Sequence, residues 1–324
     1  MRRQIMLCLM AAPMLVAAGA THAQAQATQY PAKPIRLIVP YGTGGGTDII
    51  ARLYAQKLKD AWGQSVIVEN RPGGDGIIGS EVVARSPADG YTLMLVVAGH
   101  VINPGIKSKM PFDVQTDFTP VTLVATSPWV IVTSRSLAVT TVKELVEHAK
   151  ANPGKVSFGS SEPSSRLAGE FFRLQSRVSM VNIPYKGGAQ IMTDVVGGHL
   201  DVGFTSVLTA LQHYKSDRLR VLAVAGKSRS PSMPTIPTAT ESGLPGYETF
   251  AWYGMYAPAG TPKDIVGKIQ KEVARISALP EVRERLVQLG AEPAATAPDE
   301  FAAFTRSEVS KYAKLIKDAG IQPD

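Results

Sequence analysis

Residues 41–48 read Tyr41-Gly42-Thr43-Gly44-Gly45-Gly46-Thr47-Asp48. This glycine-rich segment follows an apolar run at 35–39 and precedes a segment, 49–62, whose apolar residues recur at helical spacing. A strand, a turn and a helix in that order bring free backbone N–H groups and the positive end of a helix dipole to one point. Glycine also lets the backbone approach a ligand closely. We therefore predict half of a cleft for a small carboxylate; the alternative is a tight connection in which Thr47 or Asp48 only caps the helix.

The first residues have the features of an export signal. Arg2 and Arg3 precede an apolar run at 5–20, and small-residue cleavage patterns follow at Ala23, Ala25 and Ala27. The run is short for a membrane anchor, so we predict a signal peptide over 1–25, cleaved near Ala23 to Ala27, and a periplasmic location. Cys8, the only cysteine, lies in this segment, so we expect neither disulfides nor thiolate metal sites after cleavage.

Composition indicates a globular chain that binds an anion. The 324 residues are 44% hydrophobic and 19% charged, with a formal net charge of +7. Basic and acidic residues are mixed, as in Glu281-Val282-Arg283-Glu284-Arg285, and form no basic stripe. We expect no nucleic-acid partner, and we expect a monomer.

Short apolar runs alternate with amphipathic segments from about Pro34 onward, which is typical of an α/β protein with largely parallel sheets. We predict strands at 35–40, 65–69, 92–97, 121–132, 156–158, 181–184, 202–204, 221–225 and 252–257. We predict helices at 48–62, 76–84, 142–150, 167–175, 189–196, 208–215, 262–279, 282–289 and 298–319.

Two long extended runs, at 121–134 and 249–258, can each cross between two lobes. Two crossings make the first lobe discontinuous: we expect residues 28–126 plus 250–324 in one lobe and 127–249 in the other. Ligands of open α/β sheets bind beyond the carboxyl ends of strands, where the glycine-rich segment falls. We therefore expect the ligand between the lobes.

The second lobe offers a serine-rich loop at a corresponding place. The strand at 156–158 leads into Gly159-Ser160-Ser161-Glu162-Pro163-Ser164-Ser165-Arg166. Serine hydroxyls and amides can donate to an anion and Arg166 adds a positive charge, although Ser164 or Ser165 can equally be an N-cap. Weaker candidates follow other strands: His100, Tyr185 with Gly187 and Gly188, and Thr205 with Ser206.

Motifs for several enzyme classes are absent. The glycines lack the spacing of a dinucleotide fingerprint and no lysine follows them as in a phosphate loop. There is no G-x-S-x-G elbow, and the histidines have no metal-ligand spacing. We expect no cofactor, no metal and no catalytic residues. The alternatives are an exported hydrolytic enzyme with Ser160 or Ser165 as nucleophile and His100 as base, or a sensor that presents its ligand to a membrane receptor.

The chain resembles the Bug family, the periplasmic substrate-binding proteins of tripartite tricarboxylate transporters. The resemblance rests on the export signal and on the following motifs in this order: Ile35-Arg36-Leu37-Ile38-Val39-Pro40-Tyr41, Gly45-Gly46-Thr47-Asp48, Val68-Glu69-Asn70-Arg71-Pro72-Gly73-Gly74, Asp89-Gly90-Tyr91-Thr92-Leu93, Pro184-Tyr185-Lys186-Gly187, Gly243-Leu244-Pro245-Gly246 and Ala257-Pro258-Ala259-Gly260-Thr261-Pro262.

The resemblance implies a two-lobed protein of the type II periplasmic-binding, or Venus flytrap, architecture, which delivers a carboxylate to a membrane permease. The ligand positions that it implies are Tyr41, Gly42, Gly44, Gly45, Thr47 and Asp48 in the first lobe and Ser160, Ser161, Ser164 and Ser165 in the second. Asp48 can cap its helix, hold a water or pair with an ammonium group.

Two positions depart from the family pattern. Arg166 stands where the family often has histidine, and Thr205 where it often has aspartate. Gaining a cation and losing an acid favours a di- or tricarboxylate, or an aromatic carboxylate, over an amino acid.

Overall fold

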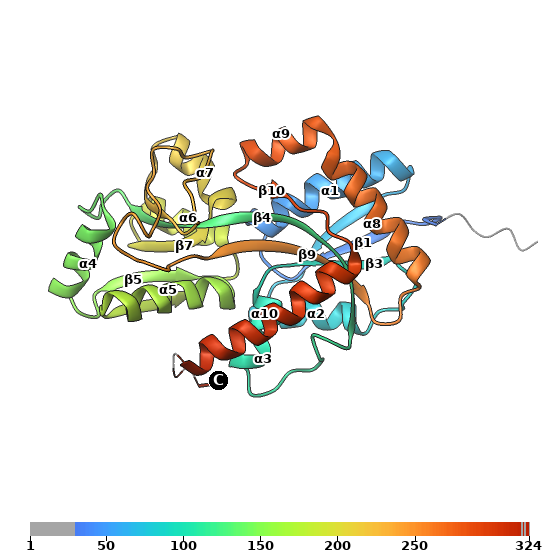
Figure 1. Ribbon diagram of the computed structural model, residues 1–324, viewed down its shortest axis with the longest axis horizontal. Helices are drawn as coiled ribbons and strands as arrows, with labels where there is room; N and C mark the ends of the chain where they lie inside the picture. Colours follow the sequence, from blue (N-terminus) through green and yellow to red (C-terminus); the bar gives the residue numbers. More distant parts are fainter. Residues whose placement is uncertain (1–29, 319, 321, 324) are drawn as a thin grey trace, which may run out of the picture.

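The computed structural model describes residues 30–318, 320, 322 and 323. The expected signal peptide lies outside them. Within the described residues, none of the helices has the length and apolar character needed to cross a bilayer. The structure is an α/β fold with two lobes, drawn side by side in Figure 1.

The first lobe holds elements from both ends of the chain. Its N-terminal elements are β1 (Ile35–Val39), α1 (Gly46–Trp62), β2 (Val66–Asn70), the 3-10 turn η1 (Gly74–Gly76), α2 (Ile77–Ala84), β3 (Thr92–Val96) and α3 (Gly99–Ile106). Its C-terminal elements are α8 (Lys263–Ala278), α9 (Pro280–Gln288), β10 (Glu292–Pro293) and α10 (Pro298–Asp318).

The second lobe is formed by the middle of the chain. It contains α4 (Val142–Ala151), β5 (Val156–Ser160), α5 (Pro163–Ser176), β6 (Met180–Pro184), α6 (Gly188–Gly197), β7 (Val202–Ser206), α7 (Val207–Lys215) and β8 (Leu219–Val224).

Two long strands, β4 (Phe118–Ser134) and β9 (Phe250–Pro258), join the lobes. They pair antiparallel from Phe118 opposite Pro258 to Pro128 opposite Phe250, and Figure 1 shows both running between the lobes. Strand β4 pairs with β9 along its first part and with β7 along its last part, so it runs from one group of strands to the other. The exact lobe boundaries, 126/127 and 249/250, stay a prediction.

The strands follow the order β2-β1-β3-β9-β4-β7-β5-β6, with β8 and β10 also paired to β4. Strand β1 is parallel to β2 and β3, and β5 is parallel to β6 and β7. All recorded pairings of β4 and β9 are antiparallel. The expectation of largely parallel sheets was thus wrong for the strands that connect the lobes, because a strand that leaves a lobe and one that returns run in opposite directions.

Helical periodicity places the apolar side chains in the core. In α8, Val266, Ile269, Val273 and Ile276 recur on one face and are all buried. Strand β3 is buried along its whole length, as expected of a strand in the middle of a sheet covered on both faces. This packing holds the carboxyl ends of the strands, and the loops that follow them, in fixed positions.

Three elements were not predicted, and one of them is the 3-10 turn η1 in the glycine-rich loop after β2. Helix α3 contains Pro104 and is short, and its Asn103-Pro104-Gly105 sequence favours a turn. Strand β10 is a two-residue pairing with β4, and no periodic pattern can reveal so short an element.

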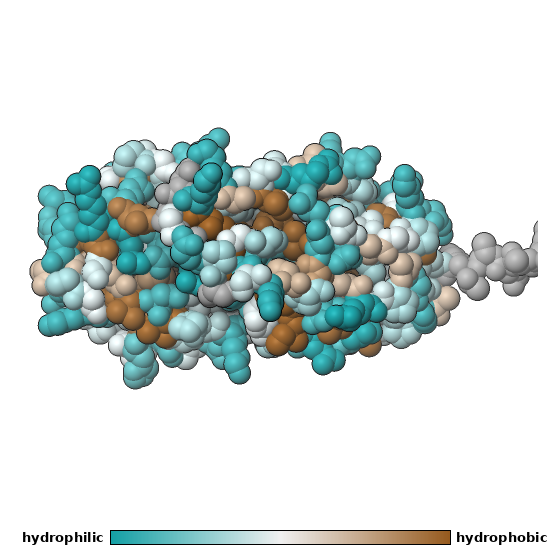
Figure 2. All heavy atoms as spheres, turned by 90° about the horizontal axis from the view of Figure 1, so that it is seen from below, coloured by the Kyte–Doolittle hydropathy of each residue, from teal (hydrophilic) through white to brown (hydrophobic). Residues whose placement is uncertain are grey.

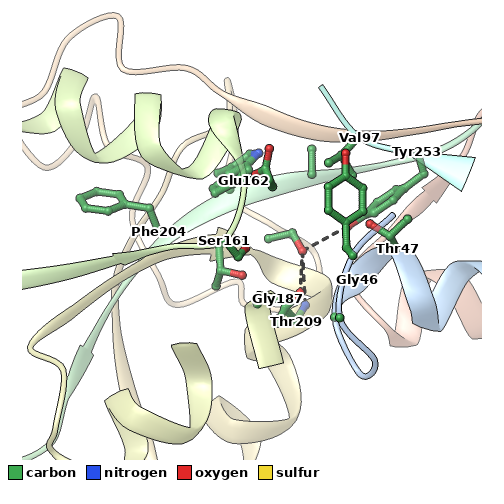
Figure 3. Close-up of a pocket in the computed structure, with 17 residues that line it drawn as sticks. Gly46, Thr47, Val97, Ser161, Glu162, Gly187, Phe204, Thr209 and Tyr253 are labelled. Atoms are coloured by element: carbon green, nitrogen blue, oxygen red, sulfur yellow. Dashed lines mark hydrogen bonds between the residues drawn. The ribbon is translucent and has the colours of Figure 1, made fainter. Parts of the chain in front are cut away.

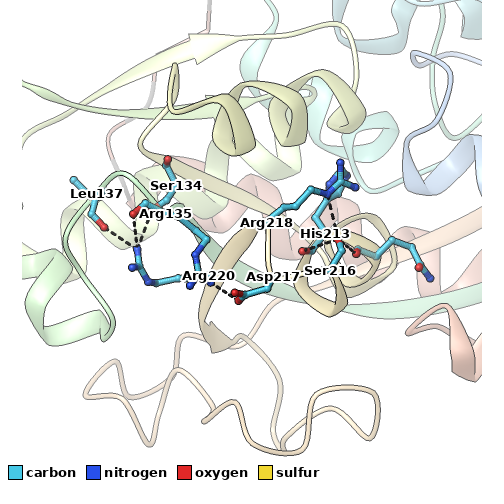
Figure 4. A network of polar contacts seen from close by, with 9 residues as sticks. Ser134, Arg135, Leu137, His213, Ser216, Asp217, Arg218 and Arg220 are labelled. Atoms are coloured by element: carbon cyan, nitrogen blue, oxygen red, sulfur yellow. Dashed lines mark hydrogen bonds and ion pairs between the residues drawn. The ribbon is translucent and has the colours of Figure 1, made fainter.

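A network of polar contacts fixes the end of β4 in the second lobe (Figure 4). The Arg220 guanidinium on β8 donates to the carbonyl oxygens of Arg135 and Leu137, each at 3.0 Å, and Arg135 pairs with Asp217. Arg218, on the same turn, donates from Nε to Ser216 Oγ at 3.1 Å. The network ties the loop after β4 to the α7–β8 turn.

Candidate functional site

A cavity of about 50 Å³ lies between the lobes, at the N-termini of several helices (Figure 3). Its lining comes from both lobes and from the crossing strands. The lining residues are Tyr41, Gly42, Gly45, Gly46, Thr47, Val97, Trp129, Ser161, Glu162, Gly187, Gly188, Phe204, Thr205, Ser206, Thr209, Ala251 and Tyr253.

The first wall is the glycine-rich segment before α1. Gly45 occupies the N-cap position, and no side chain caps the helix, so its first amide hydrogens have no partner within the helix. Gly44 has φ of +80°, a conformation that other residues adopt at a cost. The carboxylate of Asp48 accepts a hydrogen bond from the Gly44 amide at 2.9 Å and pairs with Arg52.

Asp48 is therefore engaged with its own segment. It is buried but does not line the cavity, and Arg52 and the Gly44 amide lower the pKa of its carboxyl against the effect of burial. Of the three roles considered for it, these contacts favour the one closest to capping, in which Asp48 stabilises the turn.

The opposite wall is the start of α6. Gly187 is its N-cap residue and, as in α1, no side chain caps the helix. The Gly42 amide of the first lobe donates to the Lys186 carbonyl at 3.0 Å. A Cβ at Gly187 would lie 3.0 Å from Gly42 Cα, so the two loops touch through their backbones. The lobes are closed on each other here.

Polar side chains from three elements meet at the cavity, as the dashed lines in Figure 3 show. Tyr253 on β9 donates to Ser206 Oγ at 3.2 Å, and Ser206 Oγ lies 3.1 Å from Thr209 Oγ1. A Cβ at Gly46 would lie 2.4 Å from Tyr253 Oη. The same Cβ would lie 3.3 Å from Ser206 Oγ and Thr209 Oγ1, so glycine at this position lets α1 approach both β9 and the second lobe.

The serine-rich loop is arranged differently from the expectation. Glu162 is the N-cap of α5 and accepts hydrogen bonds from Ser164 N at 2.8 Å, Ser164 Oγ at 2.6 Å and Ser165 N at 2.9 Å. Ser165 Oγ in turn accepts from the amides of Ser161 and Glu162 and donates to the Glu162 carbonyl. The donors of Ser164 and Ser165 are therefore directed to Glu162 and not into the cavity.

His100 was expected at the cleft, but the structure buries it in α3. Its ring lies 4.8 Å from that of Phe118, 5.3 Å from Tyr256 and 5.9 Å from Phe112. Neither ring nitrogen has a hydrogen-bond partner among the described residues, and burial lowers the pKa of His100 to about 3. The hydrolytic alternative requires a hydrogen bond from a nucleophilic serine to His100, and the described residues provide none.

Three further candidates also lie away from the cavity lining. Arg166 lines a separate pocket beside Pro163 and Glu170. The Tyr185 hydroxyl donates to Asp194 at 2.7 Å, and Ser160 is buried at the end of β5.

The predicted site residues thus divide into two groups. Those that line the cavity are Tyr41, Gly42, Gly45, Thr47, Ser161 and Thr205. Those that do not are Gly44, Asp48, His100, Ser160, Ser164, Ser165, Arg166 and Tyr185.

Some lining residues were missed although the sequence carried a signal for them. Trp129, Ala251 and Tyr253 lie where the two predicted crossing runs pass between the lobes, and a crossing strand must form the floor of a cleft. Gly187 and Gly188 had been noted only as a weak loop. Glu162 had no such signal, because an acid beside an anion site is not expected.

A second hollow differs in character from the cavity between the lobes. A groove of about 410 Å³ lies between α5 and α10 and is lined mainly by Phe171, Leu174, Tyr247, Tyr312 and Leu315. Figure 2 shows apolar patches among hydrophilic side chains on the face seen from below. No helix N-terminus lines this groove, so it lacks the amide donors of the cavity.

Two α/β lobes joined by two crossing strands, with uncapped helix N-termini facing a cavity between them, define the class of two-lobed solute-binding proteins. The chain belongs to the tripartite tricarboxylate transporter family receptor (TctC) family, whose model matches residues 50–321. The resemblance stated from the sequence is confirmed.

Individual relatives agree with this assignment. Protein BugT of Bordetella pertussis is 33% identical over 311 residues, which cover 95% of each chain. The structure of the periplasmic binding protein BugD superposes with a TM-score of 0.88 at 34% identity, covering 91% of this chain and 100% of that one. A protein of R. palustris described with adipate gives a TM-score of 0.89 at 33% identity, with the same coverage. The family is one of solute-binding receptors.

Proposed function

We propose that this protein captures a small carboxylate between its lobes in the periplasm, as a monomer, and delivers it to the membrane permease of a tripartite transporter. One observation carries the proposal: α1 of one lobe and α6 of the other both begin at glycines without a side-chain cap and open on the same cavity. Uncapped helix N-termini attract anions through their free amides and their dipoles. The adipate named with the R. palustris relative is an anion of this class.

The preference for a di- or tricarboxylate, or an aromatic carboxylate, depended on two positions. Arg166 lines another pocket, whereas Thr205 lines the cavity, so only the absence of an acid at Thr205 still supports it. The lining of the cavity contains no lysine, arginine or histidine, so backbone amides and hydroxyls supply the attraction for an anion.

A thermal-shift screen tests the proposal. The panel contains mono-, di- and tricarboxylates and aromatic carboxylates, and the corresponding amides serve as uncharged controls. A carboxylate at about 100 times its dissociation constant should stabilise the fold by roughly 2.7 kcal/mol, and its amide should have no effect. The proposal fails if no carboxylate raises the melting temperature, or if the protein consumes its ligand at catalytic rates.

A further inference from the structure

The cavity between the lobes has one positive side and one negative side. The uncapped N-termini of α1 and α6 supply partial positive charge at Gly46 and Gly187. Figure 3 shows these residues at one side of the cavity and Glu162 at the other. Glu162 is the only residue of the lining that has a carboxylate or a basic side chain.

The Glu162 carboxylate already uses the donors of its own helix. Pro163 has no amide hydrogen, and the amides of Ser164 and Ser165 both donate to Glu162. The chain's own carboxylate thus occupies the N-terminus of α5, where an anionic group of a ligand would otherwise bind. A second anion at this end would find no free amide at the start of α5 and would face a negative charge.

The surroundings keep Glu162 in this position. Its side chain is 8% exposed, and a Cβ at Gly99 of the first lobe would lie 2.8 Å from Glu162 Oε2. Burial raises the pKa of the Glu162 carboxyl, and the hydrogen bonds from Ser164 and Ser165 oppose that shift. Burial is the main cause of the raised pKa of Tyr41 and of Tyr253, and the negative charge of Glu162 adds to both shifts.

We infer that Glu162 determines the ligand class: an acid with one carboxylate at the α1–α6 side and a hydrogen-bond donor, a hydroxyl or ammonium group, directed at Glu162. The inference rests on the proposed carboxylate function and narrows it. A carboxylate lone pair accepts a hydrogen bond from either donor, whereas a second carboxylate of the ligand is repelled.

The test compares probes that share one carboxylate and differ at the far end. The four-carbon set is succinate, 4-hydroxybutyrate and 4-aminobutyrate, and the matching five- and six-carbon sets cover other chain lengths. Calorimetry measures the dissociation constants for the wild type, Glu162→Gln and Glu162→Ser. In at least one set the wild type should bind the hydroxy or amino acid about tenfold more tightly than the diacid, because juxtaposed like charges are costly. Both variants should bring that ratio close to one.

The controls separate charge from helix capping. Serine is a favoured N-cap, so Glu162→Ser removes the charge and retains a capping oxygen. Thr141→Ala removes the cap of α4, which accepts from Glu144 N at 3.1 Å outside the cavity, and it should lower stability without changing the ratio.

Two outcomes overturn the inference in distinguishable ways. The inference fails if the wild type binds the diacids as tightly as the hydroxy and amino acids of the same length. It also fails if neither folded variant changes the ratio of these dissociation constants. In both cases Glu162 does not select the ligand, although the proposed function stands. If no carboxylate binds to any of the proteins, the proposed function fails and this inference fails with it. If neither variant folds, the inference is decided by the wild type alone, from the ratio of its dissociation constants for the diacid and for the hydroxy or amino acid.

Discussion

His100 illustrates how strongly one side chain can depend on its surroundings. An imidazole in water titrates near neutral pH, but His100 is enclosed by Phe112, Phe118 and Tyr256. The charged form would be buried without a partner, so burial lowers the pKa of His100 to about 3 from a usual 6.5. The folded protein therefore holds His100 neutral at pH values where the unfolded chain protonates it.

This difference predicts a loss of stability in mild acid. Between pH 6.5 and about 3 the unfolded state binds the extra proton, so the free energy of unfolding should fall as pH decreases, by up to about 1.4 kcal/mol per pH unit from this group. His100→Phe should remove the contribution of His100 to this pH dependence, so the variant should be more stable than the wild type at pH 5. Urea denaturation between pH 4 and 8 measures it.

The exposed His199 supplies a surface control, because His199→Gln should change the free energy of unfolding at pH 7 by less than about 0.5 kcal/mol. Parallel stability curves for the wild type and His100→Phe would contradict the assignment of a buried neutral imidazole.

At the scale of elements, the ends of strands and helices decide which groups remain available to a ligand. Helices α4, α5 and α7 are capped by Thr141, Glu162 and Ser206, whereas α1 and α6 begin at glycines without a side-chain cap. The loop after β4 is held by Arg220, which donates hydrogen bonds to two of its carbonyls. The side-chain caps stabilise their helices, whereas the first amides of α1 and α6, which begin at the cavity, have no side-chain cap and can donate to an anion.

Arg220→Met should lower the free energy of unfolding and leave the affinity for the ligand unchanged. The substitution keeps an unbranched side chain but removes the donors to the Arg135 and Leu137 carbonyls, so we expect a loss of about 1 kcal/mol. Chemical denaturation gives the stability, and calorimetry gives the affinity. The exposed Arg218, on the same turn, is the matched control, since Arg218→Met should cost little. Equal losses of stability in Arg220→Met and Arg218→Met would show that the hydrogen bonds of Arg220 to the two carbonyls do not stabilise the protein.

The sequence was most informative where periodicity was strong. Each predicted strand and helix has a counterpart in the structure, whereas α3 was hidden by the Pro104-Gly105 pair. The site was only partly predictable, because Ser164 and Ser165 have the same sequence pattern whether their hydroxyls face a ligand or a neighbouring carboxylate. That choice depends on the direction of the Glu162 side chain, which spacing along the chain does not encode.

At the scale of the whole molecule, glycines form close contacts between the two lobes at the cavity. A Cβ at Gly42 would lie 3.1 Å from the Lys186 carbonyl oxygen, and one at Gly46 would lie 3.3 Å from Ser206 Oγ and Thr209 Oγ1. Side chains at these positions would hold the lobes apart. The closed arrangement therefore depends on backbone surfaces that come within hydrogen-bonding distance of each other.

Gly46→Ala should weaken ligand binding about tenfold or more by hindering closure, because the added Cβ would lie 3.3 Å from Ser206 Oγ and Thr209 Oγ1 of the second lobe and 2.4 Å from Tyr253 Oη of β9. Calorimetry measures the affinity, and small-angle scattering should show that ligand no longer reduces the radius of gyration. Gly267→Ala is the control: no atom lies within 4 Å of its added Cβ in α8, so it should raise stability by roughly 1 kcal/mol and leave the affinity unchanged. Wild-type affinity in Gly46→Ala would contradict a role for this contact in closure.

The course of β9 has a consequence for how the molecule is made. Strand β3, synthesised early, pairs with β1 on one side and with β9 on the other, and β9 emerges only with the last part of the chain. The edge of β3 that pairs with β9 therefore stays unpaired until the intervening segment and β9 have been synthesised. Contacts between residues this distant in sequence also form slowly. An unpaired strand edge can pair with another chain and start aggregation. We therefore expect the newly made chain to depend on a chaperone, or on rapid completion of its synthesis, to protect β3.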